Sequence, residues 1–182
     1  MWVLIVIGLL LIWTVITYNG LIQLRVRADG AWSDIGVQLK RRYDLIPNVV
    51  ETVKGYAAHE QKVFVQVTEA RSRAMQAAGP NEKAAAEGML TGALKSLFAV
   101  AENYPQLRAN ENFMGLQQSL TQVEEAVQGA RRYYNAVVRD YNTKLTVLPD
   151  RLIAQAGGFT PKEFFKLDSA EEAKAPKVSF SS

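Results

Sequence analysis

Residues 110–148, NENFMGLQQSLTQVEEAVQGARRYYNAVVRDYNTKLTVL, carry the most regular pattern in this chain. Their apolar side chains recur every three or four residues, which predicts one long amphipathic helix with Asn110 as its N-cap. At 1.5 Å per residue such a helix would be about 58 Å long, too long for a compact globule of this size to cover. We therefore expect an elongated antiparallel bundle of three to four long helices. The residues of this stripe that we expect in helix–helix contacts are Phe113, Leu120, Tyr134 and Tyr141.

A second stripe of the same kind lies earlier in the chain, between residues 32 and 56. Its spacing of three and four residues is that of a heptad seam, which predicts packing against partner helices. Arg42 occupies one seam position, and a charge facing a partner helix should pair with an acid such as Asp44, Glu51 or Glu102. The seam residues in which we expect contacts are Trp32, Ile35, Leu39, Arg42 and Ile46.

Prolines and glycines divide the helical sequence. Pro47 lacks an N–H and predicts a kink or a helix restart near residues 45–48. The sequence Gly79-Pro80-Asn81 predicts the end of one helix, with Asn81 as the cap of the next. No alternating polar and apolar run predicts a strand, so the fold class expected for the chain is all-α.

Composition excludes most catalytic chemistry. The chain has 182 residues, no Cys and one His, with a net charge of +3. Thiol catalysis, Cys-based metal sites and di-metal carboxylate centres are therefore excluded. His59-Glu60 lacks the second His of a zinc-protease helix, and no glycine loop for phosphate occurs. We expect no enzyme, no cofactor and no metal, and the charge forms no basic stripe for nucleic acid.

Residues 2–17, WVLIVIGLLLIWTVIT, are almost entirely apolar, and no charge precedes Arg25. Residues 1–24 have the length of a transmembrane helix and are expected to form the membrane anchor, with Trp2, Trp13 and Tyr18 at the interfaces. A cleaved signal peptide is less consistent with the sequence because no basic residue precedes the apolar run. A buried core helix is the other alternative, but this run is apolar on all faces.

Basic residues follow the apolar run. Arg25, Arg27, Lys40 and Arg41 are expected to face lipid headgroups, with a solvated helix face as the alternative. The positive-inside rule places the larger part of the chain in the cytoplasm, and the periplasmic orientation remains the alternative. These residues belong to the expected helix bundle, residues 25–149.

The C-terminal region, residues 150–182, differs from the bundle in character because glycine, proline and charged residues are frequent in it. It is expected to be a partly ordered tail. Its aromatic side chains are too apolar for a simple solvated terminus, so they either dock on the bundle or bind another chain. The expected tail contacts are Phe159, Phe164, Phe165 and Phe180.

Several sequence blocks together resemble the LemA family over nearly the whole chain. The blocks are Tyr18-Asn19, Leu24-Arg25, Ala31-Trp32-Ser33-Asp34-Ile35, residues 37–48 (VQLKRRYDLIPN), residues 51–56 (ETVKGY), residues 99–105 (AVAENYP), residues 109–113 (ANENF), residues 130–135 (ARRYYN), Tyr141-Asn142, Gly158-Phe159 and residues 175–178 (APKV). The resemblance implies a bacterial inner-membrane protein with one membrane helix and a long helical domain. It implies no active site, and it links the chain to membrane shaping and to the assembly of membrane complexes.

Two functions remain as hypotheses. The first is a non-enzymatic, membrane-anchored scaffold that self-associates as a homo-oligomer and shapes membrane or organises membrane complexes. The second is a monomeric or dimeric adaptor that recruits a membrane protein partner, such as a protease or signalling protein, through its tail. Both have the lipid bilayer as a partner.

Overall fold

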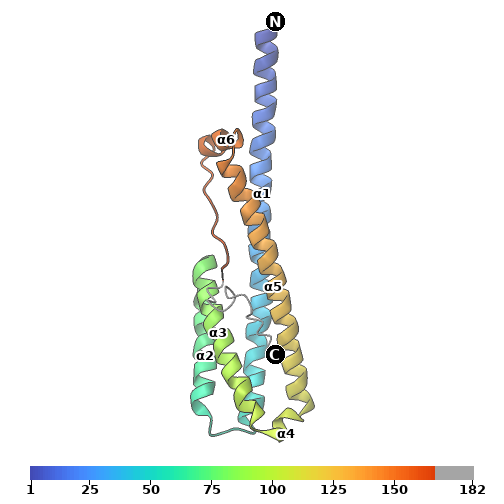
Figure 1. Ribbon diagram of the computed structural model, residues 1–182, viewed down its shortest axis with the longest axis vertical. Helices are drawn as coiled ribbons and strands as arrows, with labels where there is room; N and C mark the ends of the chain where they lie inside the picture. Colours follow the sequence, from blue (N-terminus) through green and yellow to red (C-terminus); the bar gives the residue numbers. More distant parts are fainter. Residues whose placement is uncertain (167–182) are drawn as a thin grey trace, which may run out of the picture. The chain divides into compact units, whose positions relative to one another are not determined.

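The computed structural model describes residues 1–166, and these residues form helices joined by turns and one irregular segment, without a strand. The prediction of an all-α fold that begins with a long apolar helix is confirmed. In chain order the helices are α1 (Trp2–Lys54), α2 (Gln61–Gln76), α3 (Gly79–Glu102), α4 (Pro105–Arg108), α5 (Glu111–Thr146) and α6 (Asp150–Ala156) (Figure 1). The described residues fall into two compact units. The first contains residues 1–45 and 116–164, and the second contains residues 46–115 with Phe165 and Lys166.

Helix α1 is continuous through Pro47, so the helix restart expected at residues 45–48 does not occur. A proline inside a helix costs about 3 kcal/mol. The side chains around it offset this cost, because Ile46, Val49 and Val53 are almost completely buried and each such burial contributes about 1.5 to 3 kcal/mol. Packing therefore decides against the local preference of the proline.

The first unit is built on an antiparallel pair, α1 with α5, whose ribbons lie side by side in Figure 1. The rings of Trp32 and Tyr134 are 5.3 Å apart, and Arg42 forms an ion pair with Glu124 at 3.0 Å. Arg42 lies ten residues after Trp32 on α1, and Glu124 lies ten residues before Tyr134 on α5. The two contacts therefore fit one antiparallel register. The other buried apolar residues of this pair within the first unit are Leu21, Ala28, Ala31, Ile35, Leu39, Tyr43, Leu120, Val127, Val137, Val138, Tyr141 and Leu145.

Helix α5 matches the long helix predicted from the sequence, with a difference at its end. The N-cap is confirmed, since the backbone N–H of Phe113 donates to Asn110 Oδ1 at 3.0 Å. The helix ends at Thr146 rather than at Leu148. Leu148 precedes Pro149, and a residue before proline disfavours the helical conformation. Leu148 therefore leaves the stripe and is 71% exposed.

The second unit contains the hairpin of α2 and α3, which pack on each other. Gly79 has φ +75°, a value that favours glycine, and α3 begins there. The expectation that Asn81 caps this helix is wrong, because Glu82 instead accepts a hydrogen bond from the backbone N–H of Ala78 at 3.1 Å. The buried residues of the hairpin are Phe64, Val67, Ala70, Ala74, Ala84, Ala86, Glu87, Leu90, Leu94, Leu97 and Ala101.

Candidate functional site

The apolar beginning of α1 remains exposed in the fold. Twelve large hydrophobic side chains from Trp2 to Ile16 are each at least 48% exposed. The most apolar 18-residue window of α1 has a mean hydropathy of 2.1 and is only 11% buried, so this helix is long and apolar enough to cross a membrane. Thr14 donates its hydroxyl proton to the carbonyl of Leu10 at 2.8 Å, which satisfies that polar group inside the segment. We call residues 2–16 the apolar segment.

The three expected interface aromatics occupy different surroundings. Trp2 is 78% exposed and Trp13 is half-buried. Tyr18 is 43% exposed, and its ring meets that of Phe159 edge-on with centroids 5.5 Å apart. Of the three aromatics, Tyr18 thus contacts another residue of its own chain, Phe159.

A small core closes the first unit where the apolar segment ends. Leu21, Tyr141, Leu145 and Ala154 are buried together, with Leu24, Ile153 and Phe159 packed against them. Leu21 comes from α1, the next two from α5, and Ala154 from α6. This core holds α6 beside α1 at the end of the apolar segment.

The predicted basic residues are spread along α1. Arg25 and Arg27 are exposed and are the first charged residues after the apolar segment. Lys40 lies about 22 Å beyond Arg25 at 1.5 Å per residue, further than a Debye length of about 10 Å. Lys40 forms an exposed ion pair with Asp44 at 2.9 Å, and Arg41 lies 3.5 Å from the side-chain oxygen of Gln38. A lipid contact for these four residues stays a prediction.

Arg42 faces the partner helix, as its seam position predicts, but its acidic partner is a different residue from those expected. Its side chain is 6% exposed, and its Nη2 lies 3.0 Å from Oε2 of Glu124 on α5. Asp44, one of the acids proposed from the sequence, pairs with Lys40 instead. The partner depends on the register of α1 against α5, which no local sequence feature specifies.

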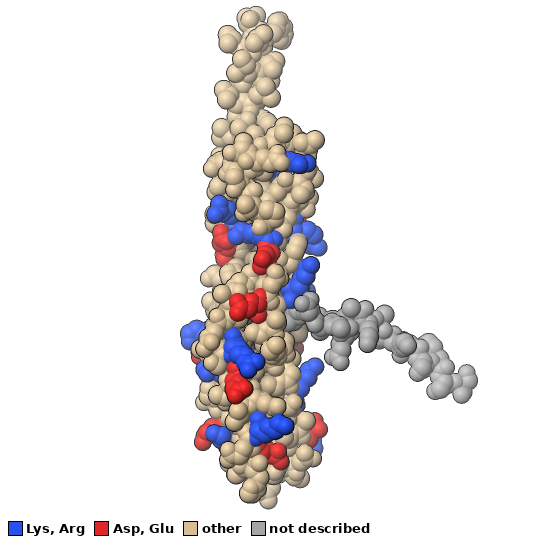
Figure 2. Space-filling view, turned by 90° about the vertical axis from the view of Figure 1, so that its left-hand side faces the viewer, with Lys and Arg blue, Asp and Glu red and all other residues tan. Residues whose placement is uncertain are grey.

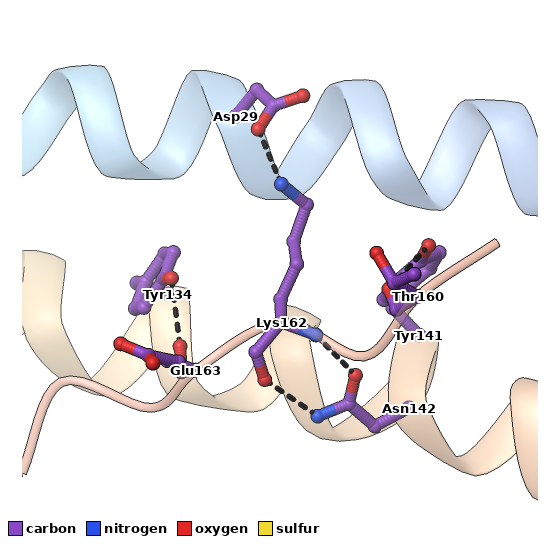
Figure 3. Close-up of polar contacts among 7 residues, drawn as sticks. All are labelled: Asp29, Tyr134, Tyr141, Asn142, Thr160, Lys162 and Glu163. Atoms are coloured by element: carbon purple, nitrogen blue, oxygen red, sulfur yellow. Dashed lines mark hydrogen bonds and ion pairs between the residues drawn. The ribbon is translucent and has the colours of Figure 1, made fainter. Parts of the chain in front are cut away.

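After α6 the chain returns along the α1–α5 pair as an irregular segment, residues 159–164, which we call the strap (Figure 3). Asn142 binds it through both ends of its amide: Nδ2 donates to the carbonyl of Lys162 at 2.8 Å, and Oδ1 accepts from the Lys162 N–H at 2.9 Å. One side chain thus satisfies both backbone groups of Lys162.

Two tyrosines of α5 and one aspartate of α1 complete the attachment. Tyr134 donates to the carbonyl of Glu163 at 2.8 Å, and Tyr141 donates to the carbonyl of Thr160 at 3.0 Å. Lys162 reaches across to Asp29 Oδ1 at 2.6 Å, so the strap joins both helices (Figure 3). The strap is therefore part of the folded unit.

Burial keeps both phenols in their donating form. It raises the pKa of Tyr134 above the ordinary value of 10.0, and the carboxylates of Asp29 and Glu163 raise it further. Burial also raises the pKa of Tyr141, against a lowering effect of Arg25 and with a smaller increase from Asp29. Both hydroxyls are therefore protonated at neutral pH and can donate to the strap.

A glycine pair directs the strap back onto the helices. Gly158 has φ +68°, and the N–H of Phe159 donates to the carbonyl of Ala154 at 3.0 Å. A Cβ on Gly157 would lie 2.7 Å from the ring of Phe159, so a side chain there is incompatible with the observed ring position. The two glycines allow the aromatic ring to fold against the end of α6.

The predicted tail aromatics are placed as follows. Phe159 is half-buried on its own chain, against Tyr18 and the Leu21 core. Phe164 is half-buried, and Phe165, in the second unit, is 1% exposed. Phe180 lies outside the described residues. The tail aromatics were expected either to dock on the bundle or to bind another chain. Phe159 docks on its own chain.

The sequence did not indicate the residues that hold the strap. Asp29 on α1, Asn142 on α5 and Lys162 in the strap are common polar residues, and their pairing arises only after the chain reverses at α6. Tyr141-Asn142 was a recognisable block, but its role as a clamp for the strap had no local signal.

The candidate metal ligands among the described residues are His, Asp and Glu side chains. No group of three or more His, Cys, Asp or Glu within residues 1–166 could hold a metal ion. His59 is exposed in the turn before α2. An open hollow of about 400 Å³ lies between α2 and α3, lined by residues such as Glu69, Arg73 and Met89. The contacts described above, those of the Leu21 core and of the strap, hold α1, α5 and α6 together next to the apolar segment.

Fold and site together define a class: an all-α protein whose N-terminal helix has the length and hydropathy of a membrane anchor. Within that class, the chain belongs to the LemA family, whose model matches residues 31–180. The resemblance seen in the sequence is thereby confirmed.

Curated relatives are similar at a low level of identity. Magnetosome protein MamQ 2 of Paramagnetospirillum magneticum is 25% identical over 175 residues, which cover 82% of this chain and 64% of that protein. Magnetosome protein MamQ of Magnetospirillum gryphiswaldense is 25% identical over 174 residues, 81% of this chain and 64% of that protein. Protein LemA of Metamycoplasma hominis is 23% identical over 141 residues, 75% of this chain and 63% of that protein. The chain thus spans less than two thirds of the length of these relatives.

Proposed function

We propose that this protein is a non-enzymatic helical scaffold, anchored in the bacterial inner membrane by residues 1–24, which self-associates and organises membrane or membrane complexes. The basic residues after the apolar segment favour a cytoplasmic location for the packed part of the chain. Membership of the LemA family and the similarity to magnetosome proteins support a membrane-associated helical protein.

One observation carries the proposal: the exposed apolar segment and the α1–α5 pair belong to one compact unit, and α1 joins them without a break. Transferring its exposed side chains from water to lipid would contribute on the order of 10 kcal/mol or more. Because no hinge separates anchor from pair, a membrane that holds the segment also orients the pair. A stiff connection of this kind suits a scaffold, which must hold other copies at a defined distance and direction.

An outer face of α1 supports self-association. Val26, Gly30, Ser33 and Val37 follow one another at helical spacing and are all exposed, with Val26 63% and Val37 49% exposed. Nothing lies within 4 Å of the position of a Cβ on Gly30. Small and apolar residues on one face allow a neighbouring helix to approach closely.

The mass of the full-length protein in mild detergent, measured by light scattering, tests the proposal. We expect a multiple of the chain mass of 20.2 kDa. The double variant Val26→Lys/Val37→Lys should lower that mass. Val65→Lys is the control, since Val65 is a comparably exposed valine on α2 (53%) and should leave the mass unchanged.

A monomeric wild-type protein at its cellular concentration would contradict the scaffold. The adaptor hypothesis would then be favoured, and deletion of residues 157–182 should abolish co-purification of a membrane protein partner. The strap is bound to α1 and α5, so the shorter deletion of residues 167–182 should be compared with it.

A further inference from the structure

The corner between α5 and α6 exposes apolar side chains in the first unit. Val147, Leu148 and Leu152 are 45%, 71% and 59% exposed. We call these three residues the apolar corner. Val147 and Leu148 lie in the turn after α5, and Leu152 lies on α6, whose Ile153 and Ala154 pack inward on the Leu21 core. On the outer side of the same short helix, Leu152 remains exposed, whereas Ala154 on the inner side is buried.

The corner lies at the end of the apolar segment. Ala154 is buried with Leu21, and Phe159, whose N–H donates to Ala154, meets the ring of Tyr18. A helix crosses about 30 Å of hydrocarbon with roughly 20 residues, so an anchor that begins near Trp2 leaves the hydrocarbon close to Leu21. The contacts therefore bring α6 to the level of the membrane interface.

Basic side chains near the apolar corner are consistent with a position at the membrane interface. Lys144 lies beside α1, with its Nζ 3.4 Å from the position of a Cβ on Gly20, and it forms an ion pair with Asp150 at 3.8 Å. Arg151 is exposed on α6, and Arg25 is exposed on α1. Figure 2 shows no acidic side chain on the visible face of the apolar segment or of the adjoining end of the pair. Basic groups beside apolar ones are the composition of helices that lie in a membrane interface.

We propose that the apolar corner is a second membrane contact, which inserts Val147, Leu148 and Leu152 into the interface of the bilayer that holds the apolar segment. The inference rests on the proposed anchor and adds to it. The unbroken α1 gives the pair the direction of the anchor, but a protein held by a single helix can still rotate about the axis of that helix. A second contact beside the anchor restricts this rotation of the α1–α5 pair.

Depth-dependent fluorescence quenching tests this contact on the full-length chain, which has no native Cys. Leu148→Cys and Leu152→Cys are each labelled with an environment-sensitive dye and reconstituted in phosphatidylcholine/phosphatidylglycerol vesicles with or without brominated acyl chains. Ile16→Cys reports the anchor. Tyr133→Cys is the negative control, since Tyr133 is 52% exposed on α5 but lies next to the Trp32 level, away from the apolar segment.

We expect brominated lipid to quench the dye at residues 148 and 152 several times more than at residue 133. Quenching at residue 16 with none at 148 or 152 would overturn the second contact and leave the anchor intact. A second copy of the chain covering the corner would give this result. Absence of quenching at residue 16 would overturn both the anchor and the inference.

Discussion

The guanidinium of Arg42 on α1 lies 3.0 Å from the carboxylate of Glu124 on α5, and its side chain is only 6% exposed. A buried charge of this kind is costly unless it is paired, so the ion pair favours one register of the two helices over its alternatives. Leu120 lies one helical turn before Glu124 and is buried, so a shift of α5 by that turn would place an apolar side chain opposite the guanidinium. The ion pair thus explains why a charged residue, Arg42, occupies a seam position: it helps to set how α1 and α5 align in the first unit.

Glu124→Ala should lower the free energy of unfolding by about 2 to 3 kcal/mol, because it leaves the Arg42 charge buried without this partner. The double variant Arg42→Met/Glu124→Leu should recover most of that loss, since it removes both charges of the pair and puts apolar side chains in their place. Urea unfolding followed by circular dichroism in detergent measures both. Lys40→Ala removes an exposed pair and should change stability by under about 0.5 kcal/mol. An equal effect of Lys40→Ala and Glu124→Ala would contradict a special role for the buried pair.

Asn142→Ala should release the strap while leaving the helices folded. It removes two hydrogen bonds to the backbone of Lys162, each contributing about 1 kcal/mol. Hydrogen exchange of the Lys162 backbone amide, which donates to Asn142, should therefore accelerate by about tenfold or more. Thr143→Ala is the matched control at the next, exposed position of α5. Unchanged exchange in the Asn142 variant would show that the tyrosines and Asp29 hold the strap without it.

Gly157→Ala should destabilise the protein by about 1 to 2 kcal/mol, because the added methyl group would displace the Phe159 ring from Tyr18 and the Leu21 core. Thermal unfolding checks the direction. Gly88→Ala is the control in an open helical position of α3, where alanine should stabilise by about 0.5 to 1 kcal/mol. If both variants stabilise, the tight fit at Gly157 has no energetic consequence.

Stability should fall at alkaline pH through Tyr134 and Tyr141. Their pKa values are raised in the fold, so the protonated phenols contribute stability that is fully present below pH 10.0 and decreases as the pH rises above it. The variant Tyr134→Phe/Tyr141→Phe should be less stable than the wild type at pH 8, and the difference should shrink towards pH 11. Urea unfolding at both pH values measures it. A constant difference would show that the phenols do not titrate with folding.

The position of helix ends shows where local reasoning worked and where it did not. Asn110 was predicted and found as a cap, because an asparagine side chain can satisfy the N–H three residues later without help from elsewhere. Asn81 had an equally suitable local sequence, but Gly79 already begins α3 and Glu82 accepts the free N–H of Ala78. Two local arrangements that satisfy an N–H at the start of a helix are available in this sequence, and the pattern alone does not choose between them.

The sequence by itself determined the helical class, the long stripe of α5 and the apolar segment, since helical periodicity and hydropathy are local properties of consecutive residues. Tertiary structure alone decided that Glu124 is the partner of Arg42, that α1 passes unbroken through Pro47, and that Asn142 holds the strap. These features depend on register and on a chain reversal, in which residues far apart in sequence meet. The free energy of such contacts comes from packing and burial between helices, and no pattern within one helix records it.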